Sequence, residues 1–495
     1  MISKFRSFWL VLVAAICIVL LAGCGDTFRQ FITPVPGPTG DPASLSHAVV
    51  TSTNPTATGL GSDMHVDVSG DSLVGNVNLG HNPLFFNSNQ GRVFIVNGDG
   101  TVSLYTGLLP LTTAVNTATL PPSTSGAIAA SAGNNGGIYV ANSGSNDVSF
   151  IPLTTTAVTQ VIPTGLNPVM VAGGGNSAKI YVVNHGDNTV TVISTIDNTF
   201  QKTIPVGSQP IWAVMSSDGE AVFVVNQGDG TLSFIDTSVD QEICGSGGSI
   251  VPCTPANRIH VGSSPNFAFY DTPRRRVYVT NTGSNSISLI NANGINFGVT
   301  PPVLPTKVGP DIALSGSPTS MVALQNGSKA YAALGGCPAG INHTNLIANL
   351  PSCTGNSISV IDLVALHESK VIVLPQIVVV PPTATGTFNG TVSIDASADS
   401  SRVYVVHAND QISVPDTTVH VPPAPPNPPV IVRLGSVSII RTSSDAELRN
   451  GDGTIKRFSA PQQDAACTPK TDPDNPGAGL LPCSLQIPFM VRVIP

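Results

Sequence analysis

A short strand-like phrase, made of one aromatic residue, flanking valines and a terminal asparagine, recurs through most of the chain. It reads Ile-Tyr-Val-Ala-Asn at 138–142, Ile-Tyr-Val-Val-Asn at 180–184, Val-Phe-Val-Val-Asn at 222–226 and Val-Tyr-Val-Thr-Asn at 277–281. The aromatic residue falls at 94, 139, 181, 223, 278, 331 and 404, so the spacings are 45, 42, 42, 55, 53 and 73. A period near 42 constrains the fold more than any local feature, because it lies in the range of four-stranded propeller blades.

Each repeat carries further fixed points. A proline lies 13 residues before the aromatic residue in four copies (Pro168, Pro210, Pro265 and Pro318). Turns rich in Gly, Asn and Asp follow the phrase, and a strand alternating with period two comes next. We therefore predict an all-β propeller of four-stranded blades. Seven aromatic anchors predict seven blades, with six or eight as alternatives.

The segment 64–80 resembles the last two strands of a unit that lacks its first two. Strands from both ends of the chain would then close the ring and leave no long open edge.

These residues resemble the YVTN family of β-propeller repeats. The signature Tyr-Val-Thr-Asn is complete at 278–281, and Ile-Ser-Val-Ile-Asp at 358–362 matches the strand that follows it in that family. The resemblance covers about residues 62–415 and departs in the sixth and seventh copies, where Leu334 and His407 replace the asparagine. YVTN repeats are also similar to those of propeller lactonases and quinoprotein dehydrogenase subunits, so the resemblance leaves an enzyme possible.

The N-terminus predicts export. Lys4 and Arg6 precede an apolar run from Phe8 to Leu20, as in a secretory signal peptide. The following Leu-Ala-Gly-Cys at 21–24 resembles the bacterial lipobox, which implies cleavage before Cys24 and lipidation of that residue. An ordinary signal peptide or an uncleaved anchor is the alternative. We expect a signal peptide at 1–23, a Pro- and Ser/Thr-rich tether at 24–61, and a lipoprotein that faces the periplasm or lies on the cell surface.

Six further cysteines fall as near neighbours in the sequence: Cys244 with Cys253, Cys337 with Cys353, and Cys467 with Cys483. The first two pairs lie where the repeat spacing departs from 42. We predict three local disulfides that restrain loop insertions, since exported proteins favour disulfides. No pair shows Cys-x-x-Cys spacing with partner histidines, so we expect no metal site.

Composition limits the classes of partner. Charged residues make up only 10% of the chain and the net charge is −8, which argues against nucleic acid. Hydrophobic residues at 41% still allow a large core. Besides the membrane, reached through its lipid anchor, we expect a protein, peptide or glycan partner and a monomeric chain.

Few residues suggest chemistry. The nine histidines are scattered, no cofactor motif is present, and a basic residue that precedes the aromatic strand in five repeats is interpreted as a solvated strand entrance. One set of residues precedes the loop prolines and would face one mouth of a propeller channel: Asn82, Asn167, Gln209, Ser264 and Ser317. Such a neutral ring could bind a sugar or a peptide backbone, or could simply satisfy turn backbones.

The remaining stretch, 421–495, opens with a polyproline spacer and then contains strand-like segments, as an appendage or a last blade beyond a propeller at 62–420. The sequence as a whole favours a non-catalytic binding or scaffolding module at the bacterial cell envelope. The alternative is a propeller enzyme of lactonase or quinoprotein-dehydrogenase type with its site in the channel.

Overall fold

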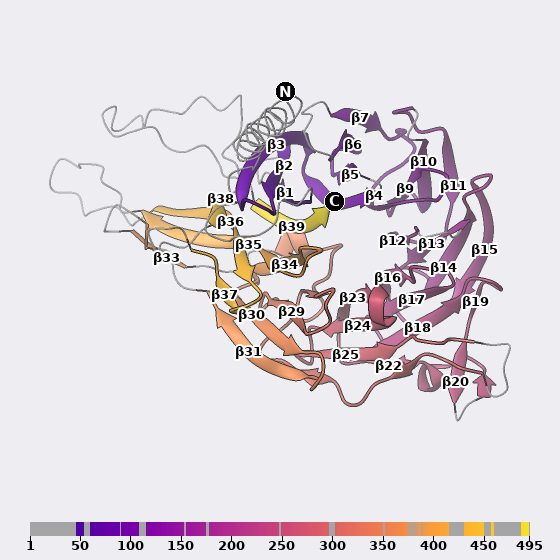
Figure 1. Ribbon diagram of the computed structural model, residues 1–495. Helices are drawn as coiled ribbons and strands as arrows, with labels where there is room; N and C mark the ends of the chain where they lie inside the picture. Colours follow the sequence, from indigo (N-terminus) through magenta and orange to yellow (C-terminus); the bar gives the residue numbers. More distant parts are fainter. Residues whose placement is uncertain are drawn as a thin grey trace, which may run out of the picture.

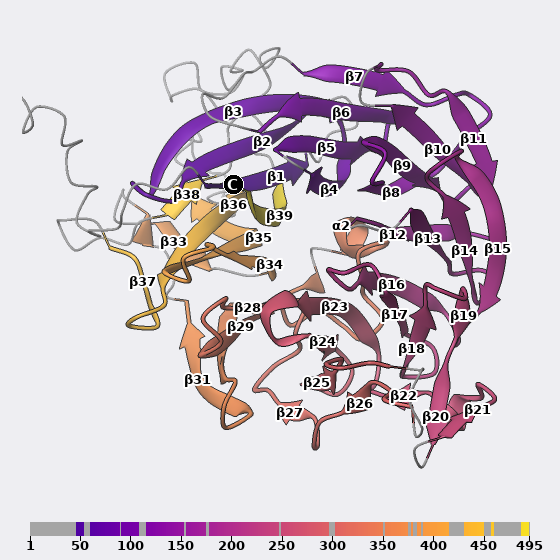
Figure 2. The same cartoon turned by 45° about the vertical axis from the view of Figure 1, so that its right-hand side comes forward.

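The computed structural model shows a ring of β-sheets whose inner strands surround a central axis (Figure 1 and Figure 2). It describes residues 46–53, 60–89, 91–107, 115–152, 155–174, 178–246, 249–296, 302–349, 352–374, 378–379, 384–387, 390–414, 430–449, 457–459 and 487–494. Within these ranges, no helix has the length and hydrophobicity needed to span a bilayer.

The ring has eight blades, not the seven that the aromatic anchors predict. Blade 1 adds the eighth, and it contains both ends of the described chain. Its inner strand β39 (Ile487–Ile494) pairs antiparallel with β1 (His47–Thr53), and β2 (Leu60–Asp67) and β3 (Ser72–His81) complete the sheet. Closure by strands from both ends is therefore confirmed. However, the N-terminal part supplies three strands, and β1 lies inside the range 24–61 that we expected to be a tether.

Blades 2 to 4 follow the predicted four-stranded antiparallel plan. Their strands, from channel to rim, are β4 (Pro83–Asn89), β5 (Arg92–Asn97), β6 (Thr101–Thr106) and β7 (Asn116–Thr119) in blade 2; β8 (Ala127–Ala132), β9 (Gly137–Asn142), β10 (Asp147–Pro152) and β11 (Gln160–Pro163) in blade 3; and β12 (Pro168–Ala172), β13 (Lys179–Asn184), β14 (Thr189–Ser194) and β15 (Thr199–Pro205) in blade 4.

Blades 5 and 6 have interrupted outer strands. Blade 5 contains β16 (Pro210–Met215), β17 (Ala221–Asn226), β18 (Thr231–Asp236), and an outer strand in two parts, β19 (Gln241–Glu242) and β22 (Ile259–His260). Between these parts lie the hairpin β20 (Cys244–Ser246) and β21 (Ser249–Val251) and the 3-10 turn η1 (Pro255–Asn257). Blade 6 contains β23 (Pro265–Asp271), η2 (Thr272–Arg274), β24 (Arg276–Asn281), β25 (Ser286–Asn291), β26 (Thr306–Lys307) and β27 (Ile312–Ala313).

Blades 7 and 8 carry the additions. Blade 7 contains β28 (Ser320–Ala323), β29 (Lys329–Leu334), β30 (Ser357–Asp362) and β31 (His367–Val373), with the helix α2 (Leu346–Asn349) between β29 and β30. Blade 8 contains β34 (Thr391–Ala396), β35 (Arg402–Val414), β36 (Val430–Arg441) and β37 (Ala446–Glu447), and the short strands β32 (Val378–Val379), β33 (Ala384–Thr387) and β38 (Arg457–Ser459) extend its sheet. Part of the 421–495 stretch therefore belongs to the last blade.

The repeated aromatic residue forms the core, as its apolar neighbours predict. All seven anchors (Phe94, Tyr139, Tyr181, Phe223, Tyr278, Tyr331 and Tyr404) are almost completely buried. Inner strands contact the inner strands of neighbouring blades around the whole ring, including β39 against β4 and β34. Burial of such large side chains between sheets is the main stabilising contribution.

The repeated asparagine is a buried tie within each blade and not only a turn residue. In blade 5, Asn226 Nδ2 donates to the hydroxyls of Thr231 and Ser233 on the next strand, at 3.0 and 2.9 Å. The Ser233 hydroxyl also accepts the backbone N–H of Gly207. A Cβ on Gly207 would lie 2.3 Å from Asn226 Nδ2, so only glycine fits there. Blades 2, 4 and 6 repeat this arrangement, which gives the Gly-x-x-Pro…Asn spacing a physical cause.

In three of the five repeats (Lys179, Lys329 and Arg402) the basic residue before the aromatic strand joins neighbouring blades, which corrects its interpretation as a solvated entrance at these positions. Lys179 Nζ lies 2.6 Å from Asp240, whose other carboxylate oxygen accepts the Tyr181 hydroxyl. Lys329 and Tyr331 bind Asp445 in the same way. Each aspartate belongs to the outer hairpin turn of the next blade, so the pattern ties blade 4 to 5 and blade 7 to 8.

The same tie closes the ring. Arg402 of blade 8 pairs with Asp71 in the corresponding turn of blade 1, and both side chains are buried. The junction between the two ends of the chain thus uses the interaction that joins consecutive repeats.

Candidate functional site

The predicted channel-mouth residues lie directly before the inner strands of blades 2, 4, 5 and 6 and, for Ser317, three residues before the inner strand of blade 7. Four of them have left-handed backbone conformations, with φ of 50° at Asn82, 53° at Asn167, 50° at Gln209 and 46° at Ser264. Gly126 and Gly390, before the inner strands of blades 3 and 8, also have positive φ. Asparagine and glycine adopt this conformation at low cost, so the backbone explains much of the residue choice.

Their backbone carbonyl groups accept hydrogen bonds from the turns that follow the aromatic strands. Asn82 O accepts the N–H of Gly98, and Asn167 O accepts the N–H of His185. Ser317 differs, since its hydroxyl lies 3.2 Å from the carbonyl oxygens of Thr282 and Cys337. The backbone groups of this ring thus serve the turns, and binding by its side chains stays a prediction.

An insertion between β29 and β30 covers this mouth of the channel. We call residues 335–349 and 352–356 the plug. The disulfide Cys337–Cys353 closes its base, and α2 lies inside the ring in Figure 2. Both cysteines are buried, at 3% and 0% exposure, so the disulfide is part of the packed structure.

The plug reaches blades on the opposite side of the channel. His343 Nε2 lies 2.8 Å from the carbonyl oxygen of Val169 in blade 4, and Asn342 Nδ2 donates to Gln227 Oε1 in blade 5. The His343 ring also packs edge-on against Trp212 at 5.0 Å between ring centroids, and against Phe85 of blade 2 at 6.3 Å. Blades 2, 4, 5 and 7 are thereby connected across the channel.

His343 is held in one neutral form. Because a carbonyl oxygen only accepts, Nε2 carries the proton. Nδ1 is shielded from solvent and has no hydrogen-bond partner among the described residues. Burial lowers the pKa of His343 to about 4, so the ring is uncharged at neutral pH.

A small cavity remains beneath the plug. Its volume is about 60 Å³, and Trp212, Phe267, His343, Phe489 and Arg492 are among its lining residues. That is room for a few water molecules, whereas ligand sites usually measure about 300–1,000 Å³. None of the described residues that line the cavity is Asp or Glu. The cavity therefore offers one neutral imidazole, one guanidinium and several side-chain amides and hydroxyls among apolar groups, in a space too small for an organic ligand.

Two of the three predicted disulfides are confirmed, Cys244–Cys253 and Cys337–Cys353. Cys467, Cys483 and the predicted lipidation site Cys24 lie outside the described residues. Disulfides are typical of proteins exported to an oxidising compartment.

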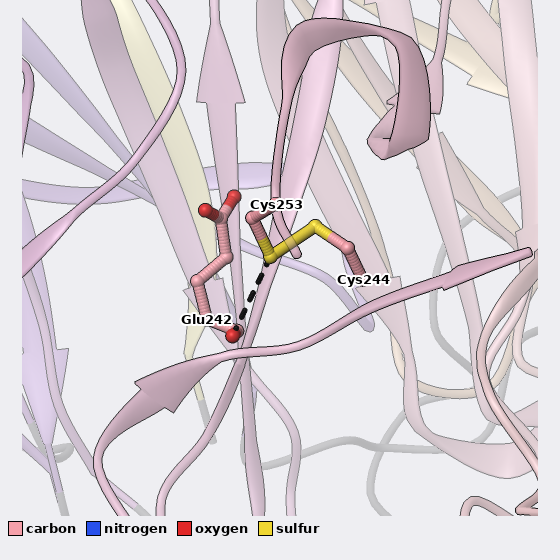
Figure 3. Close-up of side chains that lie close together, drawn as sticks. All are labelled: Glu242, Cys244 and Cys253. Carbon is pink, nitrogen blue, oxygen red and sulfur yellow. Dashed lines mark hydrogen bonds between the residues drawn. A yellow bond between two sulfur atoms is a disulfide. The ribbon is translucent and has the colours of Figure 1, made fainter. Parts of the chain in front are cut away.

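Glu242, Cys244 and Cys253 form the one group of potential metal ligands among the described residues (Figure 3). The disulfide leaves neither sulfur as a thiolate. Both carboxylate oxygens of Glu242 also accept bonds from Arg258, at 2.7 and 2.9 Å. In this oxidised form the group is a structural staple and not a metal centre.

Asp63, His65 and Tyr105 form a second cluster of titratable residues, which the sequence analysis did not predict. The Tyr105 hydroxyl donates to Asp63 at 2.5 Å, and His65 Nε2 lies 2.9 Å from the Tyr105 oxygen. Burial raises the pKa of Asp63 to about 6 and lowers that of His65 to about 3. Asp63 and His65 are fully buried, so the cluster supports the contact between blades 1 and 2 and is closed to a substrate.

Comparison with known proteins shows the fold alone. No protein-family profile and no curated protein matches the chain. Among solved structures, it is similar to one titled "Dihydro-heme d1 dehydrogenase NirN in complex with DHE", with a TM-score of 0.56, 11% identity, and coverage of 94% of this chain and 78% of that chain.

Two other similar structures have lower TM-scores. Hydrazine synthase of Kuenenia stuttgartiensis has a TM-score of 0.44 and 16% identity, with coverage of 65% of this chain and 92% of that chain. A functionally unknown protein from Desulfotomaculum acetoxidans DSM 771 has a TM-score of 0.44 and 11% identity, with coverage of 75% and 99%. The strand order and the similarity to the NirN structure confirm the β-propeller, whereas membership of the YVTN repeat family stays a prediction.

Proposed function

We propose that the protein is an exported, lipid-anchored β-propeller that binds a protein, peptide or glycan at the bacterial cell envelope through its plugged face, and that it is not an enzyme. The observation that carries this proposal is the plug. It fills the channel mouth where a propeller enzyme would admit its substrate, and about 60 Å³ remains beneath it.

The channel-enzyme alternative is less well supported. A haem-sized ligand, of the kind named for NirN, does not fit the cavity, and the histidine that lines it is bound to a backbone carbonyl. A lactonase or quinoprotein site would require several polar groups that converge on an open pocket.

The plug and the start of the N-terminal strand lie at opposite faces of the ring. The plug joins strands at one end of the blades, whereas β1 begins at the other end, where His47 is paired with Ile494. The segment from Cys24 to Ser46 can extend to at most about 75 Å. An anchor at Cys24 within this reach would leave the plugged face accessible to a partner.

Two experiments test the proposal. Metabolic labelling with a radioactive fatty acid should label the wild-type protein and not Cys24→Ala at equal protein amounts; an unlabelled wild-type protein would reject lipid anchoring.

For binding, the chain from residue 25 onward would be used to capture partners from envelope extracts. Ala348→Arg places a charge on the exposed surface of the plug, and Ile196→Arg is the matched control, because Ile196 is 83% exposed on a turn at the opposite face. A partner that is lost with Ala348→Arg and retained with Ile196→Arg is expected. Equal capture by both variants would reject the plugged face as the binding surface.

A further inference from the structure

The outer strand of blade 1, β3, is the longest outer edge among the described blades. It has 10 residues, whereas β15 of blade 4 and β31 of blade 7 have 7 each. In the described parts of the other blades, the outer strand is shorter still or is divided into two pieces. β3 pairs with β2 on its inner side, no described strand pairs with its outer side, and Figure 2 shows it at the rim of the ring.

The three long outer strands share one local geometry. Each contains a β-bulge against its neighbour, and the extra residue is Gln201 in β15, Ser369 in β31 and Val74 in β3. The residue after the bulge is Lys202 in β15, Lys370 in β31 and Gly75 in β3. Lysine and proline at a sheet edge hinder the addition of another strand. β15 also contains a proline, whereas β3 contains no Asp, Glu, Lys, Arg or Pro, so this edge alone lacks that protection.

The accessible part of the β3 edge is uncharged and partly apolar. Leu73 and Val74 are 50% and 38% exposed. Toward its other end the strand joins the ring, because the N–H of Gly80 donates to the Ser103 hydroxyl of blade 2. The stretch 72–78 therefore presents a row of backbone N–H and C=O groups that no described strand pairs, beside two exposed apolar side chains.

We infer that this edge binds an extended, uncharged peptide segment of a partner, which adds a fifth strand to blade 1. Only another extended chain matches a regular row of backbone donors and acceptors, and the neutral edge offers no charged side chain to pair with an ionic ligand. This surface is separate from the plugged face, so the inference goes beyond the proposed function.

The small contact area argues against a second copy of the ring as the occupant. The stretch 72–78 is about 24 Å long and a sheet is about 10 Å thick, so edge-to-edge contact covers roughly 240 Å² per partner. Stable protein pairs bury about 800 Å² per partner. β3 lies on the convex rim in Figure 2, so two rings that touch there would separate on either side of the contact. A peptide can follow the edge without that restriction.

The probe is a fluorescein-labelled peptide that alternates Thr and Val and is as long as the edge. N-methylation of its valines leaves only the threonine edge able to pair, which also prevents the peptide from aggregating. Fluorescence anisotropy with the chain from residue 25 onward should show saturable binding. The control peptide, methylated at the threonines as well, should not bind. Binding of neither peptide, or equal binding of both, would overturn the inference.

Variants localise the site. Gly75→Lys copies the residue that follows the bulge in β15 and β31, so the strand should still form, and binding should weaken at least tenfold. Val373→Lys is the matched control, because Val373 is 64% exposed on β31. It should leave binding unchanged, as should Ala348→Arg, so failure of this inference is distinguishable from failure of the plugged face. Equal effects of Gly75→Lys and Val373→Lys would refute the site.

Two further measurements identify the occupant. Hydrogen exchange should slow at 73–78 when the probe binds and stay unchanged at 199–205 in β15; protection of β15 instead would contradict the assignment. Sedimentation velocity should find the wild-type chain monomeric. A dimer that is lost with Gly75→Lys would show that a second copy occupies the edge and would overturn the peptide as its ligand.

Discussion

The ion pair at the ring closure should be the most sensitive electrostatic contact between blades. Arg402 Nε lies 3.3 Å from both carboxylate oxygens of Asp71, and the two side chains are 2% and 0% exposed. Replacing Arg402 by methionine keeps the apolar stem but leaves a buried carboxylate without its cation. Loss of one partner of a buried pair typically costs about 3–5 kcal/mol. We expect Arg402→Met to lower the free energy of unfolding by that amount.

The repeat provides a matched control. Lys179→Met removes the equivalent pair between blades 4 and 5, where the side chains are 30% and 15% exposed, so its cost should be about 1 kcal/mol or less. Urea unfolding would be followed by fluorescence of Trp212, which is the only tryptophan after residue 23 and is 5% exposed.

A double-mutant cycle separates the pair from its surroundings. Leu366 occupies the turn position of Asp71 in blade 7, with a similar left-handed φ of 53°, so leucine is compatible with this backbone. We expect Asp71→Leu with Arg402→Met to cost less than the sum of the single changes. The reasoning fails if Arg402→Met costs no more than Lys179→Met, or if the two changes at the closure are additive.

Three further predictions concern buried groups. The pKa of Asp63 is about 6 in the folded state against an ordinary 3.8, so the folded state binds a proton on Asp63 at a higher pH than the unfolded state does. The free energy of unfolding therefore gains a contribution from Asp63 as pH falls from 6 to 4. Over the same range His65 makes the opposite contribution, because its folded-state pKa is lowered to about 3. Relative to wild type, Asp63→Asn should therefore lose roughly 1.4 kcal/mol per pH unit across this range in urea unfolding; parallel curves would contradict this. Gly207→Ala should lower the melting temperature, at a cost of about 1–3 kcal/mol, and shortening Asn226 to alanine should relieve part of that cost. Cys337→Ser opens a 16-residue loop and should cost about 3 kcal/mol with faster hydrogen exchange at 341–349, whereas unchanged exchange would show that packing alone holds the plug.

The sequence predicts the architecture well because the repeat is local. The buried aromatic residue, the turn residues and the alternating strand all lie within about 42 residues of one another, so each blade can be recognised from its own segment. Only the last two strands of blade 1, in the segment 64–80, could be recognised in this way. Its strand β1 reads His-Ala-Val-Val-Thr-Ser-Thr without an aromatic residue, and its inner strand comes more than 400 residues later. The blade count therefore required the long-range pairing of β1 with β39.

The candidate site was predictable only in part. The cysteine pairs indicated where the repeat is interrupted, and two of the predicted disulfides are present. The sequence does not indicate which blades an inserted segment contacts. His343 contacts the carbonyl oxygen of Val169 across the channel, and these two residues are 174 positions apart in the sequence. Likewise, no local pattern marks Asp63 and Tyr105 as neighbours, because they come together only at the contact between two blades.

The repeated positions are poor places to look for function, because the fold already uses their polar groups. The asparagine amide binds two hydroxyls of its own blade, the Lys–Asp pairs join blades, and the left-handed residues at the mouth supply carbonyls to turns. A side chain that is fixed in this way cannot change its partner without weakening the ring. The plug and the β20–β21 hairpin lie outside the repeat, and each is stapled by its own disulfide. The plug covers the channel mouth, so recognition at that mouth should depend on the segments that interrupt the period.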